Sequence, residues 1–167
     1  NVFTNLKIKG AGATKHDRLP LTDSQLTLLE PAFSGDAIAW ALYVTLRDTG
    51  ARVSEISGLR TKDCDLVAKC LHISPTPWRG LKTTNSQRSV PFSAEAVTAL
   101  GKLIQNNTQD PEAPLFARYA KERGADSCSA MLMKRLRTVI TDKKLTMHSL
   151  RHRMKDKLRN TGCPEAI

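Results

Sequence analysis

The spacing of apolar residues divides this chain into helical runs and one short stretch with a strand-like pattern. In DAIAWALYVTLRDTG, Ile38, Leu42 and Leu46 recur at the four-residue spacing that lines one face of a helix. After the third helical run the period changes: KCLHIS and QRSVPF are short strand-like runs, separated by the turn-rich segment PTPWRGLKTTNS. The sequence therefore predicts a mainly α fold with a small antiparallel β-sheet, that is, an α+β domain.

Capping residues mark where the predicted helices begin and end. Ser, Thr and Asp side chains accept hydrogen bonds from the free N–H groups at a helix start, and Gly readily adopts the left-handed conformation that ends one. Thr22 and Gln25 form a capping box. A short helix is expected around VSEISGLR, and a basic amphipathic helix in CSAMLMKRLRTVI. The other predicted caps are Asp36, Gly50, Ser93, Thr146 and Gly162.

The charge balance favours a polyanionic partner. The chain of 167 residues, enough for one domain, holds 26 Lys and Arg against 16 Asp and Glu, a net charge of +10. Such an excess is typical of proteins that bind nucleic acid or an anionic membrane surface. The plain alternative is a basic soluble protein without such a partner. A membrane is the less favoured partner, because no long apolar run, lipidation signal or signal peptide is present.

The cysteines predict neither a metal site nor a disulfide framework. Cys64, Cys70, Cys128 and Cys163 are scattered, and none forms a CxxC pair. We therefore expect free thiols in a reducing cytosol, and no metal or other cofactor.

The last predicted helix, MHSLRHRMKDKLRN, gathers candidate catalytic side chains. His148, Arg151 and His152 project from neighbouring parts of one helical face. A zinc protease helix needs Glu directly after the first His, and Ser149 stands there, so zinc hydrolysis is disfavoured. The plain alternative is a solvated basic helix with His152 as a core residue, and this segment alone favours that alternative.

Two earlier segments carry further candidates. Arg52 opens a short helix, where a guanidinium beside free backbone N–H groups makes a good phosphate site, and Glu55 can hold it from one turn away. Lys82 lies in a turn leading to a strand, from which a flexible lysine can deliver a proton or a positive charge. The plain alternatives are a surface Arg–Glu pair and a solvated lysine.

Together the three segments resemble the tyrosine recombinase (phage integrase) family. The family pattern is TGxRxSEhxxLxxxDhD (h is hydrophobic), then a Lys-Thr turn before an R-x-hPh strand, then HxLRHT. TGARVSEISGLRTKD matches the first part almost throughout. The resemblance spans about residues 20–165. The later matches are Lys82, Thr83, Arg88, Pro91, Phe92, His148, Leu150, Arg151 and His152.

The resemblance implies site-specific recombination by DNA strand breakage and rejoining in a tyrosine recombinase catalytic domain. By motif, Arg52 and Arg151 grip the scissile phosphate, because guanidinium forks offset charge on its non-bridging oxygens without a metal. Lys82 protonates the leaving 5′ oxygen, and His148 assists with hydrogen bonding and proton transfer. A tyrosine forms a covalent 3′-phosphotyrosine intermediate.

Other positions take supporting roles by the same resemblance. Glu55 supports the site without performing chemistry, and His152 is better interpreted as structural. Arg88, Lys155 and Arg153, which replaces the family's usual Thr, are candidate DNA contacts.

Neither tyrosine of the chain matches the family's nucleophile. Tyr43 lies in an apolar helix and is expected in the core, and Tyr119 is expected in a loop or at a helix edge. In the family, a Gly-His motif and then the Tyr follow a segment like NTGCPEAI. The opening segment is polar, Gly-rich and basic, and by the same resemblance we expect residues 1–20 to be a hinge from a missing N-terminal DNA-binding domain. Residues 21–167 are expected to be a catalytic domain, truncated before the nucleophile and inactive in cleavage.

The combined prediction is an integrase of a phage, prophage or other mobile element. Its full-length parent is expected to recombine attachment sites in double-stranded DNA as a tetramer, in the cytoplasm, with no cofactor and no membrane association. Two alternatives remain: a noncatalytic DNA-binding module that retains the recombinase fold, and a basic protein-interaction domain without a nucleic-acid role.

Overall fold

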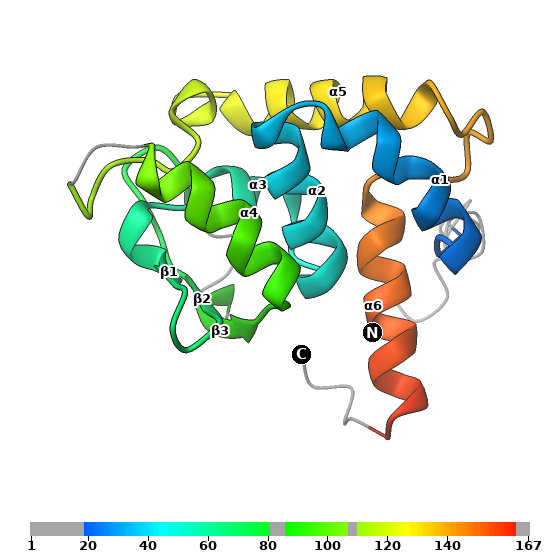
Figure 1. The fold of residues 1–167 in the computed structure, drawn as a ribbon, viewed down its shortest axis with the longest axis horizontal. Helices are drawn as coiled ribbons and strands as arrows, with labels where there is room; N and C mark the ends of the chain where they lie inside the picture. Colours follow the sequence, from blue (N-terminus) through cyan, green and yellow to red (C-terminus); the bar gives the residue numbers. More distant parts are fainter. Residues whose placement is uncertain (1–18, 81–85, 107–109, 163–167) are drawn as a thin grey trace, which may run out of the picture.

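The computed structural model of the chain describes residues 19–80, 86–106 and 110–162. Most of the predicted hinge, together with Lys82 and Cys163, lies outside the described residues. Helices dominate, and a small sheet lies between the third and fourth of them in the sequence (Figure 1). The elements are α1 (Asp23–Ser34), α2 (Ala37–Thr49), α3 (Val53–Ser57), η1 (Thr61–Asp63), β1 (Cys64–Asp65), β2 (Cys70–Ile73), β3 (Arg88–Pro91), α4 (Ala94–Gln105), η3 (Ala117–Tyr119), α5 (Gly124–Arg137) and α6 (His148–Asn160).

The first, second and fourth helices begin at the residues predicted from local sequence. The Thr22 hydroxyl accepts from the Gln25 N–H at 3.3 Å, and the Gln25 side chain accepts from the Thr22 N–H at 2.9 Å, which completes the capping box. Asp36 Oδ1 accepts from two N–H groups of the first turn of α2 at 3.0 Å. Ser93 Oγ accepts from the Ala96 N–H at 3.3 Å and caps α4. Each cap satisfies donors that the helix itself leaves free.

The start of α6 differs from the prediction. Thr146 does not cap this helix, which begins at His148 after Met147, and no side chain makes the cap hydrogen bond. Instead, Ser149 Oγ accepts from the Thr146 N–H at 3.0 Å, so the contact runs back from inside the helix. The other end agrees with the prediction, because Gly162 has a φ of +76° and closes the helix with a bond to the Arg159 carbonyl.

The sheet is antiparallel, as predicted, and has three strands in the order β1-β2-β3. β2 and β3 are the two predicted runs, and their register pairs Leu71 with Val90 and Ile73 with Arg88. β1 was not predicted, because a two-residue strand is too short to show a period. Leu71 and Ile73 are buried, whereas the arginine side of β3 remains partly accessible.

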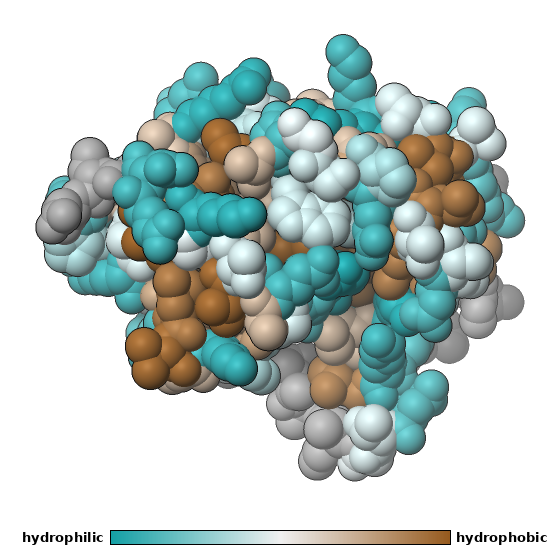
Figure 2. All heavy atoms as spheres, viewed as in Figure 1, coloured by the Kyte–Doolittle hydropathy of each residue, from teal (hydrophilic) through white to brown (hydrophobic). Residues whose placement is uncertain are grey.

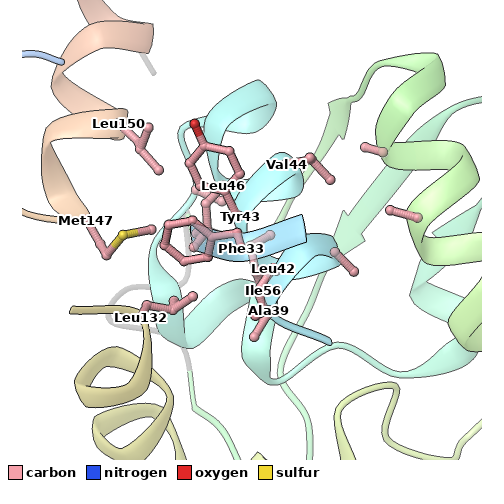
Figure 3. Close-up of a cluster of buried hydrophobic side chains, with 14 of the residues drawn as sticks. Phe33, Ala39, Leu42, Tyr43, Val44, Leu46, Ile56, Leu132, Met147 and Leu150 are labelled. Atoms are coloured by element: carbon pink, nitrogen blue, oxygen red, sulfur yellow. The ribbon is translucent and has the colours of Figure 1, made fainter. Parts of the chain in front are cut away.

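The core forms around α2, which packs against α1, α3, α4 and α6. Figure 3 shows Phe33 and Tyr43 at its centre; their rings stack with centroids 4.6 Å apart. Leu132 of α5 and Leu150 of α6 approach the same cluster from other sides. Both side chains are almost fully buried, and each such burial stabilises the fold by about 1.5–3 kcal/mol.

Gly50 sets how closely α6 approaches the end of α2. It has a φ of +60°, the left-handed conformation that ends α2, as the sequence predicts. A Cβ atom on this residue would lie 2.6 Å from Met154 Cβ of α6. Glycine therefore lets the two helices meet where the chain turns toward α3.

One face of the molecule carries mostly hydrophilic side chains, with hydrophobic groups in separate patches (Figure 2). Among the helices of the described residues, none is long and apolar enough to span a membrane.

Candidate active site

Arg52 and Glu55 form a local pair at the start of α3. The Arg52 N–H donates to Glu55 Oε2 at 2.8 Å, and Arg52 Nη1 donates to Oε1 at 2.8 Å. The Glu55 side chain is only 3% exposed, whereas that of Arg52 is 37% exposed. The carboxylate is thus held inside, and the guanidinium that it orients remains accessible.

Arg88 brings the sheet to the same carboxylate. From β3 its Nη1 and Nη2 donate to Glu55 Oε1 and Oε2 at 3.1 and 2.9 Å, a bidentate pair. Its Nη1 also donates to the Ser86 carbonyl at 2.9 Å. Glu55 therefore joins two arginines that are 36 residues apart in the sequence, and fixes β3 against α3.

The environment of Glu55 keeps it ionised. Burial alone would raise its pKa, but hydrogen bonds from Arg88 and Arg52 together with their positive charge outweigh burial and lower the pKa from 4.5 to about 2. One negative charge then faces two guanidinium groups at neutral pH. The cluster retains net positive charge.

Arg151 adds a third guanidinium from α6. Its Nη1 donates to the Gly50 carbonyl at 2.7 Å, which anchors the side chain at the turn before Arg52. Burial lowers the pKa of Arg151, and the positive charges of Arg52 and Arg88 lower it further, while Glu55 opposes them. The structure thus brings Arg52, Glu55, Arg88 and Arg151 together from three separate segments.

Two hollows flank this cluster. Arg52 and His148 line one of about 470 Å³ between α3, α5 and the start of α6. Arg88, Arg151 and Lys155 line the other, of about 380 Å³, between β3 and α6. Each hollow thus presents basic side chains to a ligand that could lie against the cluster.

The two histidines of α6 lie one turn apart on the helix. Their ring centroids are 4.9 Å apart, with the rings almost perpendicular. His148 is exposed beside Arg52, and His152 is half-buried behind it. Within the described part of the chain, no three His, Cys, Asp or Glu side chains gather as metal ligands.

Arg153 lies away from the cluster. Its Nη1 donates to the Leu21 carbonyl at 2.9 Å, and its Nη2 pairs with Asp23, so it ties α6 to the start of α1. Its predicted DNA contact stays a prediction, as does that of Lys155. Two contacts of the site were not predicted from the sequence: that of Arg88 with Glu55, and that of Arg151 with the Gly50 carbonyl. For the contact between Arg151 and the Gly50 carbonyl, the one signal in the sequence was the glycine that ends α2.

The family model described as "Phage integrase family" matches residues 24–167. No curated protein matches the chain.

Solved structures share the fold. A crystal structure of XerA recombinase is 23% identical, with a TM-score of 0.69 over 89% of this chain and 52% of that one. The Tn1549 transposon integrase in complex with circular intermediate DNA is 23% identical, with a TM-score of 0.63 over 87% of this chain and 56% of that one. The same integrase with transposon right end DNA is 24% identical, with a TM-score of 0.63 over 87% and 55%. The chain thus spans about half the length of each.

Proposed function

The chain belongs to the phage integrase family, the tyrosine recombinases, and we propose that it supplies the phosphate-activating centre of a site-specific DNA recombinase. The observation that carries this proposal is the meeting of Arg52 and Arg151 beside a buried Glu55 that is shared with Arg88. Two guanidinium groups that meet beside one carboxylate, with excess positive charge, suit one phosphodiester. The proposed partner is double-stranded DNA, in agreement with the DNA complexes of the Tn1549 integrase.

In the proposed mechanism, Arg52 and Arg151 donate to the non-bridging oxygens of the scissile phosphate. Attack by a tyrosine hydroxyl on phosphorus forms the 3′-phosphotyrosine bond and breaks the bond to the 5′ oxygen. Negative charge builds on the oxygens that the two guanidinium groups face, so these contacts strengthen toward the transition state. Lys82 gives its proton to the leaving oxygen, and His148 takes part in proton transfer from the tyrosine.

We further propose that residues 1–167 alone do not cleave DNA. Tyr43 is fully buried and donates to the Leu26 carbonyl at 3.2 Å; burial raises its pKa to about 12. Tyr119 is 4% exposed, and burial raises its pKa as well. Both hydroxyls are buried in the core, so we infer that neither Tyr43 nor Tyr119 is the nucleophile.

We also propose a domain arrangement and an assembly for the whole protein. Residues 21–167 are the catalytic domain, and residues 1–20 are the hinge to a DNA-binding domain. The protein acts as a tetramer on attachment sites of a phage, prophage or other mobile element, in the cytoplasm. The family membership and the shared fold of the recombinase structures support these proposals.

Binding of a duplex oligonucleotide, followed by fluorescence anisotropy over a range of salt concentrations, tests the phosphate centre. Arg52→Ala and Arg151→Ala should each weaken binding by about tenfold, and each should lower the slope of log affinity against log salt by about one. Lys102→Ala, which removes one exposed charge on α4, is the matched control and should change affinity much less. Equal binding by all four proteins would contradict the proposed centre.

A second assay separates chemistry from binding. After incubation with plasmid DNA and denaturation in detergent, the chain should give no covalent protein–DNA complex. A complex that disappears in Tyr43→Phe or Tyr119→Phe would overturn the proposed lack of cleavage.

A further inference from the structure

A buried hydroxyl lies at the turn between α2 and α3, next to the contact that anchors Arg151. It belongs to Thr49, the last residue of α2, which is only 9% exposed. Thr49 Oγ1 donates to the Thr45 carbonyl at 2.6 Å and accepts from the Ala51 N–H at 3.2 Å. A hydroxyl has one proton and two lone pairs, so it can make both bonds at once. The bond to Thr45 therefore fixes the side chain in the orientation that meets the Ala51 N–H.

The peptide group between Gly50 and Ala51 joins Thr49 to Arg151. Its N–H donates to Thr49 Oγ1, and its carbonyl accepts from Arg151 Nη1 at 2.7 Å. The N–H and the carbonyl point from opposite edges of one planar unit. A rotation that takes the N–H away from Thr49 therefore also turns the carbonyl away from Arg151.

The glycine before this peptide group makes such a rotation possible. Gly50 has a φ of +60° and a ψ of 18°, and a residue without Cβ also adopts other conformations at positive φ that most residues avoid. Ala51 is only 5% exposed, so without the Thr49 hydroxyl its N–H would be left buried and without that acceptor. A buried N–H without a partner is costly, and rotation about the ψ angle of Gly50 can relieve the cost. The hydroxyl thus opposes the rotation.

We propose that Thr49 is a positioning residue of the phosphate-activating centre, which acts through the Gly50–Ala51 peptide group to hold the Arg151 guanidinium beside Arg52. In this role Thr49 does not contact the phosphate. It lines the hollow between β3 and α6 together with Arg151, at the end of α2 where the two side chains meet the same peptide group. The role rests on the proposed function, because it requires that Arg151 bind a phosphate.

Amide hydrogen exchange of the ¹⁵N-labelled chain tests the geometry without DNA. Thr49→Val keeps the shape of the side chain and removes the hydroxyl. It should speed exchange of the Ala51 amide by about tenfold. The Gly50 amide, which donates to the Leu46 carbonyl at 3.0 Å, should exchange as in wild type. An Ala51 amide that exchanges at the same rate in both proteins would overturn the role of Thr49.

Duplex binding, followed by fluorescence anisotropy, separates positioning from a merely structural role. Thr49→Val should weaken binding about two- to tenfold, and Thr49→Ser, which keeps the hydroxyl, should bind within about twofold of wild type. In an Arg151→Ala background, Thr49→Val should change the affinity by less than about twofold, because no guanidinium then depends on the peptide group. In a background of Lys102→Ala on α4, Thr49→Val should have the same effect as in wild type.

Failure of this role can be distinguished from failure of the phosphate centre. If Arg151→Ala binds duplex DNA like wild type, the phosphate centre is contradicted, and the role of Thr49 with it. If Arg151→Ala weakens binding, whereas Thr49→Val has no effect or has the same effect with and without Arg151, only the role of Thr49 is overturned. Thr49→Ala takes the place of Thr49→Val in both measurements if the valine variant does not fold.

Discussion

Replacement of Glu55 by glutamine probes the centre of the arginine cluster. The pKa of Glu55 is lowered from 4.5 to about 2, which at 1.36 kcal/mol per unit corresponds to about 3 kcal/mol of stability. Because the pKa is lower in the folded state, this stability is fully present above pH 4.5 and is lost as the pH falls through 2. Glu55→Gln keeps the shape of the side chain and removes its charge. We expect it to cost about 3 kcal/mol at neutral pH, since it leaves Arg52 and Arg88 without their counter-charge.

Urea unfolding, followed by the fluorescence of Trp40 and Trp78, measures the free energy of unfolding of wild type and of Glu55→Gln at pH values from 7 to 2. The free-energy gap between wild type and Glu55→Gln should narrow as the pH falls, and nearly close at the acid end. Glu112→Gln is the matched control. Glu112, like Glu55, pairs with an arginine, in this case Arg60, but its side chain is 56% exposed. Its effect should be much smaller. A gap that stays constant over this pH range, or a Glu55→Gln protein as stable as wild type, would refute the assignment of Glu55 as the ionised centre.

Three further substitutions test how the fold positions the site. Gly50→Ala should destabilise the chain by at least about 1 kcal/mol in thermal unfolding, because of its positive φ and the clash with Met154; unchanged stability would contradict the close approach of α6. Asp36→Ala should cost about 1–2 kcal/mol through loss of the α2 cap and of the 2.8 Å pair with Arg135, and an unaffected unfolding midpoint would argue against both contacts. Tyr43→Phe should cost about 1 kcal/mol in urea unfolding for its one buried hydrogen bond, whereas a loss of several kcal/mol would show that the hydroxyl has other partners.

The sequence predicted those features of the fold that depend on neighbouring residues. The caps at Thr22, Asp36 and Ser93 involve bonds that span two or three residues, so their signal is contained in the local sequence. The same reasoning failed at Thr146, because a serine inside the following helix provides the contact in the reverse direction. A local pattern shows that a polar side chain is near a helix start, but two such side chains compete on geometry that the pattern does not contain.

Long-range contacts explain most of what the sequence did not predict about the candidate site. The motifs selected Arg52, Glu55, Arg88 and Arg151, but they did not predict that the Arg88 guanidinium binds Glu55 from 33 residues away. The DNA contact assigned to Arg88 stays a prediction. Periodicity says nothing of which carboxylate a strand arginine will meet.

A crystal structure of the chain with a short DNA duplex tests the central claim most directly. The account predicts that the guanidinium groups of Arg52 and Arg151 donate to non-bridging oxygens of the same backbone phosphate, with Glu55 still held by Arg52 and Arg88. Duplex DNA bound on another face, with Arg52 and Arg151 contacting no common phosphate, would contradict it.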